Sequence, residues 1–297
     1  MSIDMHCHTL FSVDGYCTPE ALVDVAVGRG ISTLSITEHN SLGSLQRAQK
    51  YAGEKGIRYI PGVEFDGVWG TRTLHFLAYG FNAHDEALNS FAEHNFGCAE
   101  RNFSRYLEIL ERDYGVKRET LIKGLAKRYP THPSPVLSLA YANHAMVAEG
   151  IFPDIAAAIK TETVINKKVL ERWGSEAVEP YATFEVIRDV VHNADGIVLL
   201  AHVALGNKGN LEKQLSLIRE LIDKGLDGFE LYTPFNLREP HFNELVAESR
   251  RLGCAVSGGS DCHNAAEPGA SLGTVEAPEY VVETIQSAIV AQRTKPK

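Results

Sequence analysis

The chain has 297 residues, 44% of them hydrophobic and 23% charged, which is the composition of an ordinary globular protein with a substantial core. Its formal net charge of −9 excludes a long positive groove for nucleic acid, but a small phosphorylated ligand remains possible beside bound metal ions. The five cysteines are scattered without a CxxC pair, no leader-like segment opens the chain, and no apolar run reaches membrane-spanning length. We therefore expect reduced thiols and a soluble, cytoplasmic protein with no membrane partner.

Short β-rich runs alternate with helical segments over most of the chain. Alternation of this kind implies parallel strands joined by right-handed crossovers. Seven strands without a clear edge favour an α/β fold closed into an irregular barrel, and a doubly wound open sheet is the alternative. The expected strands are Ile3–His6, Thr33–Thr37, Tyr59–Val63, Leu74–Tyr79, Ile197–Ala201, Gly228–Tyr232 and Ala255–Ser257. The expected helices between them are residues 18–30, Ser41–Lys55, Thr183–Asn193, Leu211–Lys224 and Glu239–Leu252.

The middle of the chain breaks this alternation, because it contains helical segments and no convincing strand. We interpret residues 84–180 as an inserted helical cap and residues 1–83 with 181–297 as the barrel. Insertions between barrel elements commonly cover a site and select its substrate. The helices expected in the cap are Glu100–Tyr114, Glu119–Arg128, Pro135–Glu149 and Asp154–Ile159.

Residues able to bind metal recur where the expected strands end. His6 and His8 lie two apart on a strand, so both rings point to one face while Cys7 turns away. Functional side chains of parallel barrels gather at the carboxyl ends of strands, and His75, which enters its strand, fits this rule least well. Burying so many ionisable groups without a metal costs several kcal/mol each. The candidate ligands are His6, His8, Asp14, His39, Glu64, His75, His202, Asp261 and His263.

Histidine and carboxylate ligands without thiolate suit two or three divalent ions of Mn, Fe or Zn. Clustered ions of this kind lower the pKa of water, so that hydroxide attacks phosphorus, and they neutralise the phosphate and leaving oxygens. The candidate catalytic residues are Asp14, His202 and Asp261, the last two as proton-transfer groups. The candidate phosphate and substrate contacts from the cap are Arg101, Lys167, Lys168, His132 and His144.

Five motifs together resemble the polymerase and histidinol phosphatase (PHP) family. They occur in the family's order and span residues 1–82 and about 181–275. The resemblance implies a distorted (β/α)7 barrel, a binuclear or trinuclear metal centre at its carboxyl rim and hydrolysis of phosphoesters. The motifs are Asp4-x-His6-x-His8-Thr9-x-Phe11-Ser12-x-Asp14-Gly15, Thr37-Glu38-His39-Asn40, Gly62-Val63-Glu64, Ala201-His202 and Gly259-Ser260-Asp261-Cys262-His263.

The resemblance also implies roles for single residues. His6 and His8 would bind one ion, Glu64 would bridge it to a second, and His39 and His75 would complete the second site. Asp14, His202, Asp261 and His263 match the remaining ligand positions. The motif departs from the family at Glu38, where the usual acidic residue is Asp, and the Arg-Thr-His element of the family's caps has no clean match.

The insertion resembles that of the family's small nucleotide-phosphate hydrolases, which act on AMP, on 3′,5′-bisphosphonucleotides or on cyclic phosphodiesters. We therefore predict a metal-dependent phosphoesterase whose partner is a small phosphorylated molecule such as a nucleotide mono-, bis- or cyclic phosphate. The alternatives are a histidinol-phosphate phosphatase and an exonuclease on short oligonucleotides. A binding module with a merely structural metal is the alternative that is not an enzyme.

Overall fold

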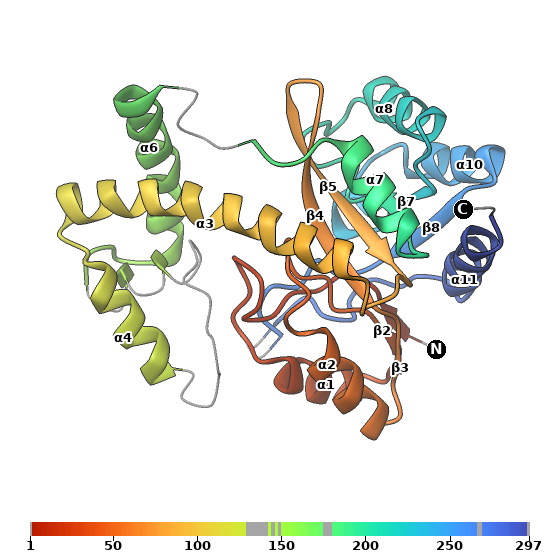
Figure 1. Ribbon diagram of the computed structural model, residues 1–297, viewed down its shortest axis with the longest axis horizontal. Helices are drawn as coiled ribbons and strands as arrows, with labels where there is room; N and C mark the ends of the chain where they lie inside the picture. The colour runs from red at the N-terminus through yellow and green to blue at the C-terminus, as the bar shows by residue number, and fades with distance from the viewer. Residues whose placement is uncertain are drawn as a thin grey trace.

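The computed structural model describes residues 2–128, 142–143, 146–147, 150–174, 180–265 and 269–295 (Figure 1). They form a mixed α/β fold with two sheets. The smaller sheet is parallel and has the order β1-β2-β3, and the larger has the order β4-β5-β6-β7-β8. The strands are β1 (Ser2–Asp4), β2 (Ile31–Leu34), β3 (Arg58–Tyr59), β4 (Gly62–Trp69), β5 (Arg72–Tyr79), β6 (Ile197–Leu200), β7 (Gly228–Tyr232) and β8 (Ala255–Gly258).

The expectation of parallel strands throughout is wrong at one place. β4 and β5 form an antiparallel hairpin, and β5 also pairs antiparallel with β6. The single strand expected at Tyr59–Val63 is divided into β3 and β4, since Pro61 has no N–H to donate to a ladder. Glu64 therefore lies near the start of β4 and does not end a strand.

The two sheets are open, so a closed barrel is not confirmed. Backbone hydrogen bonds outside the named strands nevertheless join them on two sides. On one side Met5 N donates to Gly258 O at 3.0 Å and Asp261 N donates to His6 O at 2.8 Å. On the other, Asn40 N donates to Glu64 O at 2.7 Å. These contacts bring the segments after β1, β2 and β8 together with the first residues of β4.

Helices pack on the outside of the sheets. The first begins where Thr18 accepts a hydrogen bond from Ala21 N, with proline at its first position, and its end is followed by Gly30 at φ +69°. Large apolar side chains such as Phe65, Phe76 and Phe229 fill the space between sheet and helices. The helices are α1 (Pro19–Gly28), α2 (Leu45–Glu54), α7 (Phe184–Asn193), α8 (Leu211–Asp223), α9 (Pro234–Leu237), α10 (Phe242–Leu252) and α11 (Tyr280–Arg293), of which α9 and α11 were not expected as separate helices.

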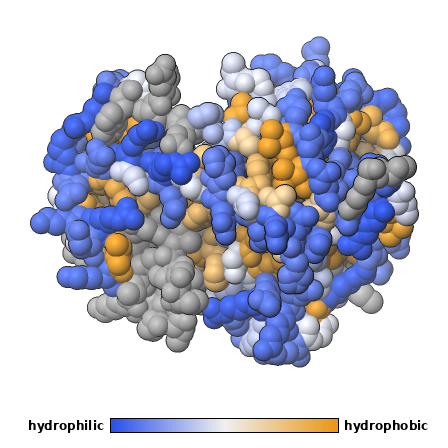
Figure 2. All heavy atoms as spheres, viewed as in Figure 1, coloured by the Kyte–Doolittle hydropathy of each residue, from blue (hydrophilic) through white to orange (hydrophobic). Residues whose placement is uncertain are grey.

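The insertion is helical in its described part. A long helix, α3 (Glu86–Tyr114), runs from the strands to a lobe that it forms with α4 (Arg118–Arg128) and α6 (Ile155–Trp173) (Figure 1). Both α3 and α6 are longer than expected, and the helix expected at Pro135–Glu149 lies mostly outside the described residues. The lobe has its own apolar core, and its outer part is covered mainly by hydrophilic side chains (Figure 2). Among the helices described, none has the length and apolarity needed to cross a membrane.

Candidate metal centre

Glu64 is the centre of a cluster of imidazole rings. It is fully buried, and each of its carboxylate oxygens contacts more than one ring. The ring nitrogens that surround it are 3.1 Å away for His6 Nε2 and His75 Nδ1, and 3.3 Å away for His8, His39 and His202 Nε2. A single β4 carboxylate thus faces side chains delivered from after β1, after β2, from β5 and from after β6.

Two aspartates complete the cluster. Asp261 Oδ1 lies 3.2 Å from Nε2 of both His6 and His8, and Asp14 Oδ2 lies 3.0 Å from His263 Nε2 and 3.4 Å from His39 Nε2. The described residues contain three sets of potential ligands, and within each set the ligand atoms all lie within 4.8 Å of one another. The sets are His6, His8, Glu64 and Asp261; His39, Glu64 and His75; and His8, Asp14, His39 and His263.

The hairpin explains why His75 belongs to this cluster although it begins a strand. Because β5 runs opposite to β4, its first residues lie at the same end of the sheet as the last residues of the parallel strands. His75 pairs across the ladder with Asp66, two residues after Glu64. His75 therefore lies at the same edge of the sheet as the other candidate ligands, although it lies near the beginning of its strand.

Several of the rings are held through their second nitrogen, which fixes both tautomer and orientation in metal sites. Glu230 Oε1 lies 3.0 Å from His6 Nδ1, Ser12 Oγ lies 3.3 Å from His8 Nδ1, and the backbone oxygen of Asp261 lies 2.9 Å from His263 Nδ1. Glu230 also accepts a hydrogen bond from the backbone N–H of His202 at 2.9 Å.

Sequence reasoning missed Asp66 and Glu230. Asp66 Oδ1 lies 3.3 Å from both His39 Nδ1 and His75 Nε2, the nitrogens that do not face Glu64. The signal for Asp66 was its spacing, since Glu64 and Asp66 are two apart on one strand and share a face. The signal for Glu230 was a carboxylate inside an otherwise apolar strand, Gly228–Tyr232.

Strained backbone supports the same region. Of the four described non-glycine residues with positive φ, three belong to the cluster or adjoin it: Asn40 at 54°, His202 at 25° and Asp261 at 52°. Such conformations persist where surrounding contacts determine them, typically at functional sites. Gly259 is required by close approach, because a Cβ there would lie 2.4 Å from His6 N.

Burial and the charges of neighbouring side chains shift the pKa values of several groups in the cluster. Despite burial, the charges of the surrounding histidines, with His6 foremost, hold the pKa of Glu64 well below its ordinary value. Burial likewise opposes the charged form of His263, yet the Asp14 carboxylate raises its pKa to about 9. Burial, followed by the charge of His263, lowers the pKa of His8 to about 4. Neighbouring positive charge thus favours the charged form of carboxylates in the cluster such as Glu64.

Glu38 has a different task from the ligands. Burial raises the pKa of its carboxyl to about 7, and its two oxygens accept hydrogen bonds from the backbone N–H and the hydroxyl of Thr9. The longer side chain at this position therefore holds the loop that follows His8.

The donor set fits divalent metal ions. The three sets consist only of imidazole nitrogens and carboxylate oxygens, and most of these side chains are buried or nearly so. Neutral imidazole with carboxylate suits Mn, Fe and Zn, whereas a structural zinc site would be richer in cysteine. Among the described residues, the arrangement could hold metal at more than one position.

The structure does not bring the two cap lysines to this cluster. Lys168 contacts Asp113 at the far end of α3, and Lys167 pairs along α6 with Glu171 at 3.7 Å with its side chain 76% exposed. Arg101 is on the exposed side of α3, where it donates to Cys98 Sγ at 3.4 Å. His132 and His144 lie outside the described residues.

Tyr181 was also missed, and it lies where the chain returns from the insertion. Burial and then the charge of Asp66 raise its pKa, so its hydroxyl stays protonated at neutral pH. Tyrosine between two expected elements carries no spacing signal, so only the structure could reveal its place.

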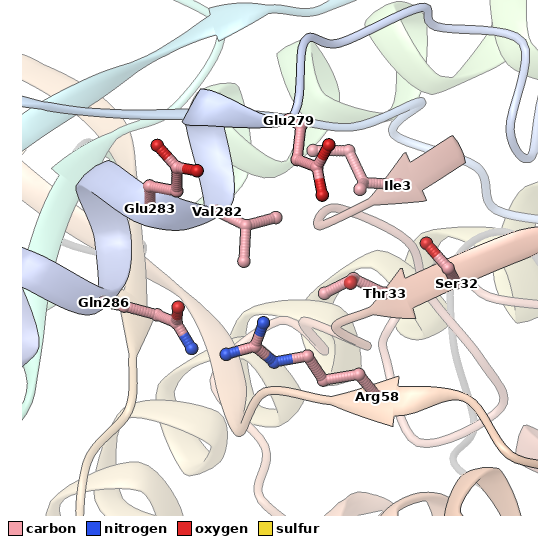
Figure 3. Close-up of a pocket in the computed structure, with 8 residues that line it drawn as sticks. All are labelled: Ile3, Ser32, Thr33, Arg58, Glu279, Val282, Glu283 and Gln286. Atoms are coloured by element: carbon pink, nitrogen blue, oxygen red, sulfur yellow. The ribbon is translucent and has the colours of Figure 1, made fainter. Parts of the chain in front are cut away.

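Two cavities differ in their relation to the cluster. One of about 420 Å³ is lined by His75 and His202 together with Arg72 and the loop after β6. The other, of about 340 Å³, lies between α11 and the first strands (Figure 3). Arg58 points into it from β3, and Glu279 and Glu283 face it from the region of α11. Its strand residues precede the ligand-bearing ends, so it is separate from the centre.

An α/β fold whose strand ends deliver histidines and carboxylates to one buried cluster defines a metal-centred protein. The family model of the PHP domain matches residues 4–131. The chain is 27% identical over 304 residues, 99% of each chain, to the 3′,5′-nucleoside bisphosphate phosphatase of Chromobacterium violaceum. It is 30% identical over 205 residues to the 5′-3′ exoribonuclease Rnm of Salmonella typhimurium, covering 67% of this chain and 64% of that one.

The fold has a solved counterpart. A candidate metal-dependent phosphoesterase from Bifidobacterium adolescentis superposes with a TM-score of 0.77 at 23% identity, covering 96% of this chain and 95% of that one. The chain is therefore similar to the PHP family by its family model over residues 4–131, and to a nucleoside bisphosphate phosphatase over nearly its whole length.

Proposed function

We propose that the protein is a metal-dependent phosphoesterase that hydrolyses a small phosphorylated substrate. The observation that carries the proposal is the convergence of five histidine rings on the buried Glu64, with Asp14 and Asp261 beside them. Sharing of Glu64, His8 and His39 between the three sets supports a centre of two or three ions of Mn, Fe or Zn. The backbone hydrogen bonds that join the two sheets support a distorted (β/α)7 barrel as the fold that carries this centre.

The nine predicted ligands would hold the ions: His6, His8, Asp14, His39, Glu64, His75, His202, Asp261 and His263. When bound, the ions lower the pKa of water so that it attacks at neutral pH, and they neutralise the charge of the phosphate. Glu230, Ser12 and Asp66 orient the rings. His202 and Asp261 lie at the cluster with restrained backbones, and we assign proton transfer to whichever of them does not bind an ion.

The substrate class follows from the relatives and from the space beside the cluster. The Chromobacterium violaceum relative is a phosphatase of 3′,5′-nucleoside bisphosphates and matches the chain over nearly its whole length. The cavity beside His75 and His202 has room for the part of a nucleotide beyond the phosphate. We propose nucleotide mono-, bis- or cyclic phosphates as substrates, with residues 84–180 acting as the cap and a cytoplasmic location.

A substrate panel with protein reconstituted with Mn²⁺ tests this function. It should contain nucleoside mono-, bis- and cyclic phosphates and histidinol phosphate, with release of phosphate or of the opened ester measured for each. We expect turnover of a nucleotide substrate, and its loss together with bound metal in His6→Ala and Asp261→Asn. Absence of hydrolysis across the panel in metal-loaded protein would instead favour a binding module.

A second candidate is an exonuclease on short oligonucleotides. The likeness to exoribonuclease Rnm favours it, although that likeness covers 64% of the Rnm chain. Turnover of a mononucleotide should be compared with that of a 5′-phosphorylated trinucleotide. Preference for the trinucleotide would support the exonuclease, and preference for the mononucleotide would support the phosphatase.

A further inference from the structure

Asn95 connects the insertion to the metal centre. It lies on α3, is fully buried, and its carboxamide makes three hydrogen bonds to three different segments. Its Nδ2 donates to Asn40 Oδ1 at 2.6 Å and to the backbone oxygen of Asp66 at 2.9 Å. Its Oδ1 accepts from the backbone N–H of Ala182 at 3.1 Å. One amide thus joins α3, the loop after His39, β4 and the segment that returns from the insertion.

Asn40 continues the connection toward the cluster. Its Nδ2 donates to Asp66 Oδ2 at 2.6 Å, and its Oδ1 accepts from Asp66 N at 2.9 Å. Asn40 is fully buried and has a backbone φ of 54°, which residues other than glycine rarely adopt. Its hydrogen bonds to Asp66 and Asn95 hold the backbone in this conformation. The Asp66 side chain is therefore fixed on one oxygen by Asn40, while its other oxygen faces the ligand rings.

The free oxygen of Asp66 reaches two ligands at once. Oδ1 lies 3.3 Å from His39 Nδ1 and 3.3 Å from His75 Nε2, and the opposite nitrogen of each ring faces Glu64. If those opposite nitrogens bind metal, the nitrogens facing Asp66 must carry the protons. Asp66 is then the common acceptor that fixes the tautomer and the orientation of both rings.

We propose that Asn95 is a positioning residue for the His39–Glu64–His75 metal position, and that it acts through Asn40 and Asp66. The inference rests on the proposed metal-dependent function and adds that the insertion helps to build the centre. The insertion thereby contributes to metal binding through a fixed hydrogen-bond relay. A displacement of α3 changes the support of His39 and His75, but not that of His6, which is held by Glu230.

The matched control for Asn95 is Asn89, the same residue type six positions earlier on α3. Its Nδ2 donates to the backbone oxygens of Ala83 and Asp85 at 3.0 and 2.8 Å, so it holds the start of the helix, and no side-chain hydrogen bond among the described residues joins it to the cluster. Asn89→Ala therefore reports what loss of a side-chain amide does to α3 alone.

The experiment titrates the full-length protein with Mn²⁺ alone and follows binding by electron paramagnetic resonance, with thermal unfolding measured in parallel. We expect Asn95→Ala and Asp66→Asn each to weaken one class of bound Mn²⁺ by about 10–100-fold, the usual effect of losing an outer partner of a ligand. The loss of Mn²⁺ binding free energy in the double variant should be smaller than the sum of the losses in the two single variants, because both residues act through the same hydrogen-bonded connection. Asn89→Ala should bind Mn²⁺ like the unaltered protein.

The possible results separate the two proposals. Unchanged Mn²⁺ binding in Asn95→Ala, or additive losses in the double variant, would overturn the role of Asn95 while leaving the metal centre intact. Equal losses of binding in Asn95→Ala and Asn89→Ala would reduce Asn95 to a packing role. An unaltered protein that binds none of Mn²⁺, Fe²⁺ and Zn²⁺ would instead overturn the proposed function. Should Asn95→Ala fail to fold, Asp66→Asn still tests whether the two rings depend on this acceptor.

Discussion

The cluster around Glu64 and the outer part of the insertion use charge in opposite ways. In the cluster, buried or partly buried carboxylates face imidazoles at 3.0–3.4 Å, with several atoms shared between partners. In the insertion, ion pairs such as Lys167–Glu171 lie at the surface, while an apolar core holds the helices together. Buried charge is costly unless specific partners surround it, as the rings surround Glu64, whereas exposed charge costs little and marks solvated surface.

Removing the charge at the centre should have the largest effect. Glu64→Gln keeps the size of the side chain but removes the negative charge that faces five rings. We expect hydrolysis to fall on the order of 10³-fold or more, because the ions' contribution to the barrier is several kcal/mol. Metal content should fall in parallel, as measured by elemental analysis after dialysis.

Glu248→Gln is the matched control for that variant. Glu248 is also a buried carboxylate, but it pairs with Arg219 and Arg251, and these cations lower its pKa to about 2. We expect normal metal content and near-normal turnover. Equal loss of metal in both variants would contradict the assignment of Glu64 as a metal ligand.

Protons should replace metal in the chelator-treated protein, which makes its stability depend on pH. The folded pKa of His263 is raised from 6.5 to about 9, so the folded state binds more protons than the unfolded state in this window. Its stabilisation is complete below pH 6.5 and is lost as pH rises through 9. His8, lowered to about 4, acts oppositely and destabilises as pH falls from 6.5 toward 4.

The melting temperature of the chelated protein should therefore be highest near neutral pH and fall toward pH 9. Saturating Mn²⁺ should remove the fall above pH 7, because metal binds the deprotonated rings better. His263→Gln should flatten the alkaline limb of the chelated protein. The same alkaline fall with and without metal would contradict this assignment.

Strand geometry predicts part of the group of side chains that the structure brings together. His6 and His8 follow from the two-residue period of an extended segment, and Glu64 from its place beside an apolar run. Asp66 and the antiparallel β4–β5 hairpin were not predicted. An apolar run does not show in which direction its strand pairs with a neighbour, and all strands were assumed to be parallel. The closed barrel expected from seven strands is not confirmed, because both sheets are open.

Cap residues were harder to assign for a physical reason. Lysine and arginine on a helix carry the same pattern whether they bind substrate or only face water, and no period separates the two. Lys168 is the example, since its partner is Asp113, 55 residues away in the sequence. Position in three dimensions, and not residue type, decides which cation of the insertion reaches a ligand.

Arg101 is the cap cation that we expect to matter, and its effect should be intermediate. It lies on α3 six residues after Asn95 and directly before Asn102, which hydrogen-bonds Tyr181. If Arg101 binds a substrate phosphate, Arg101→Ala should raise KM about tenfold or more, since a charge-assisted hydrogen bond contributes about 1.5–3 kcal/mol. Steady-state kinetics with a nucleoside bisphosphate measures it, and Lys167→Ala is the control with unchanged KM.

The smallest effect is expected from Lys168→Ala. Its ammonium contacts the Asp113 carboxylate and lies 5.6 Å from the centre of the Tyr114 ring, at the end of α3 opposite to the strands. Exposed pairs of this kind contribute little, and a cation engaged there is not directed at the cluster. We expect kcat/KM to change by less than about twofold. A tenfold rise in KM would show instead that α6 reaches the substrate, and the contrast between a charge-paired centre and a solvated insertion would then no longer hold.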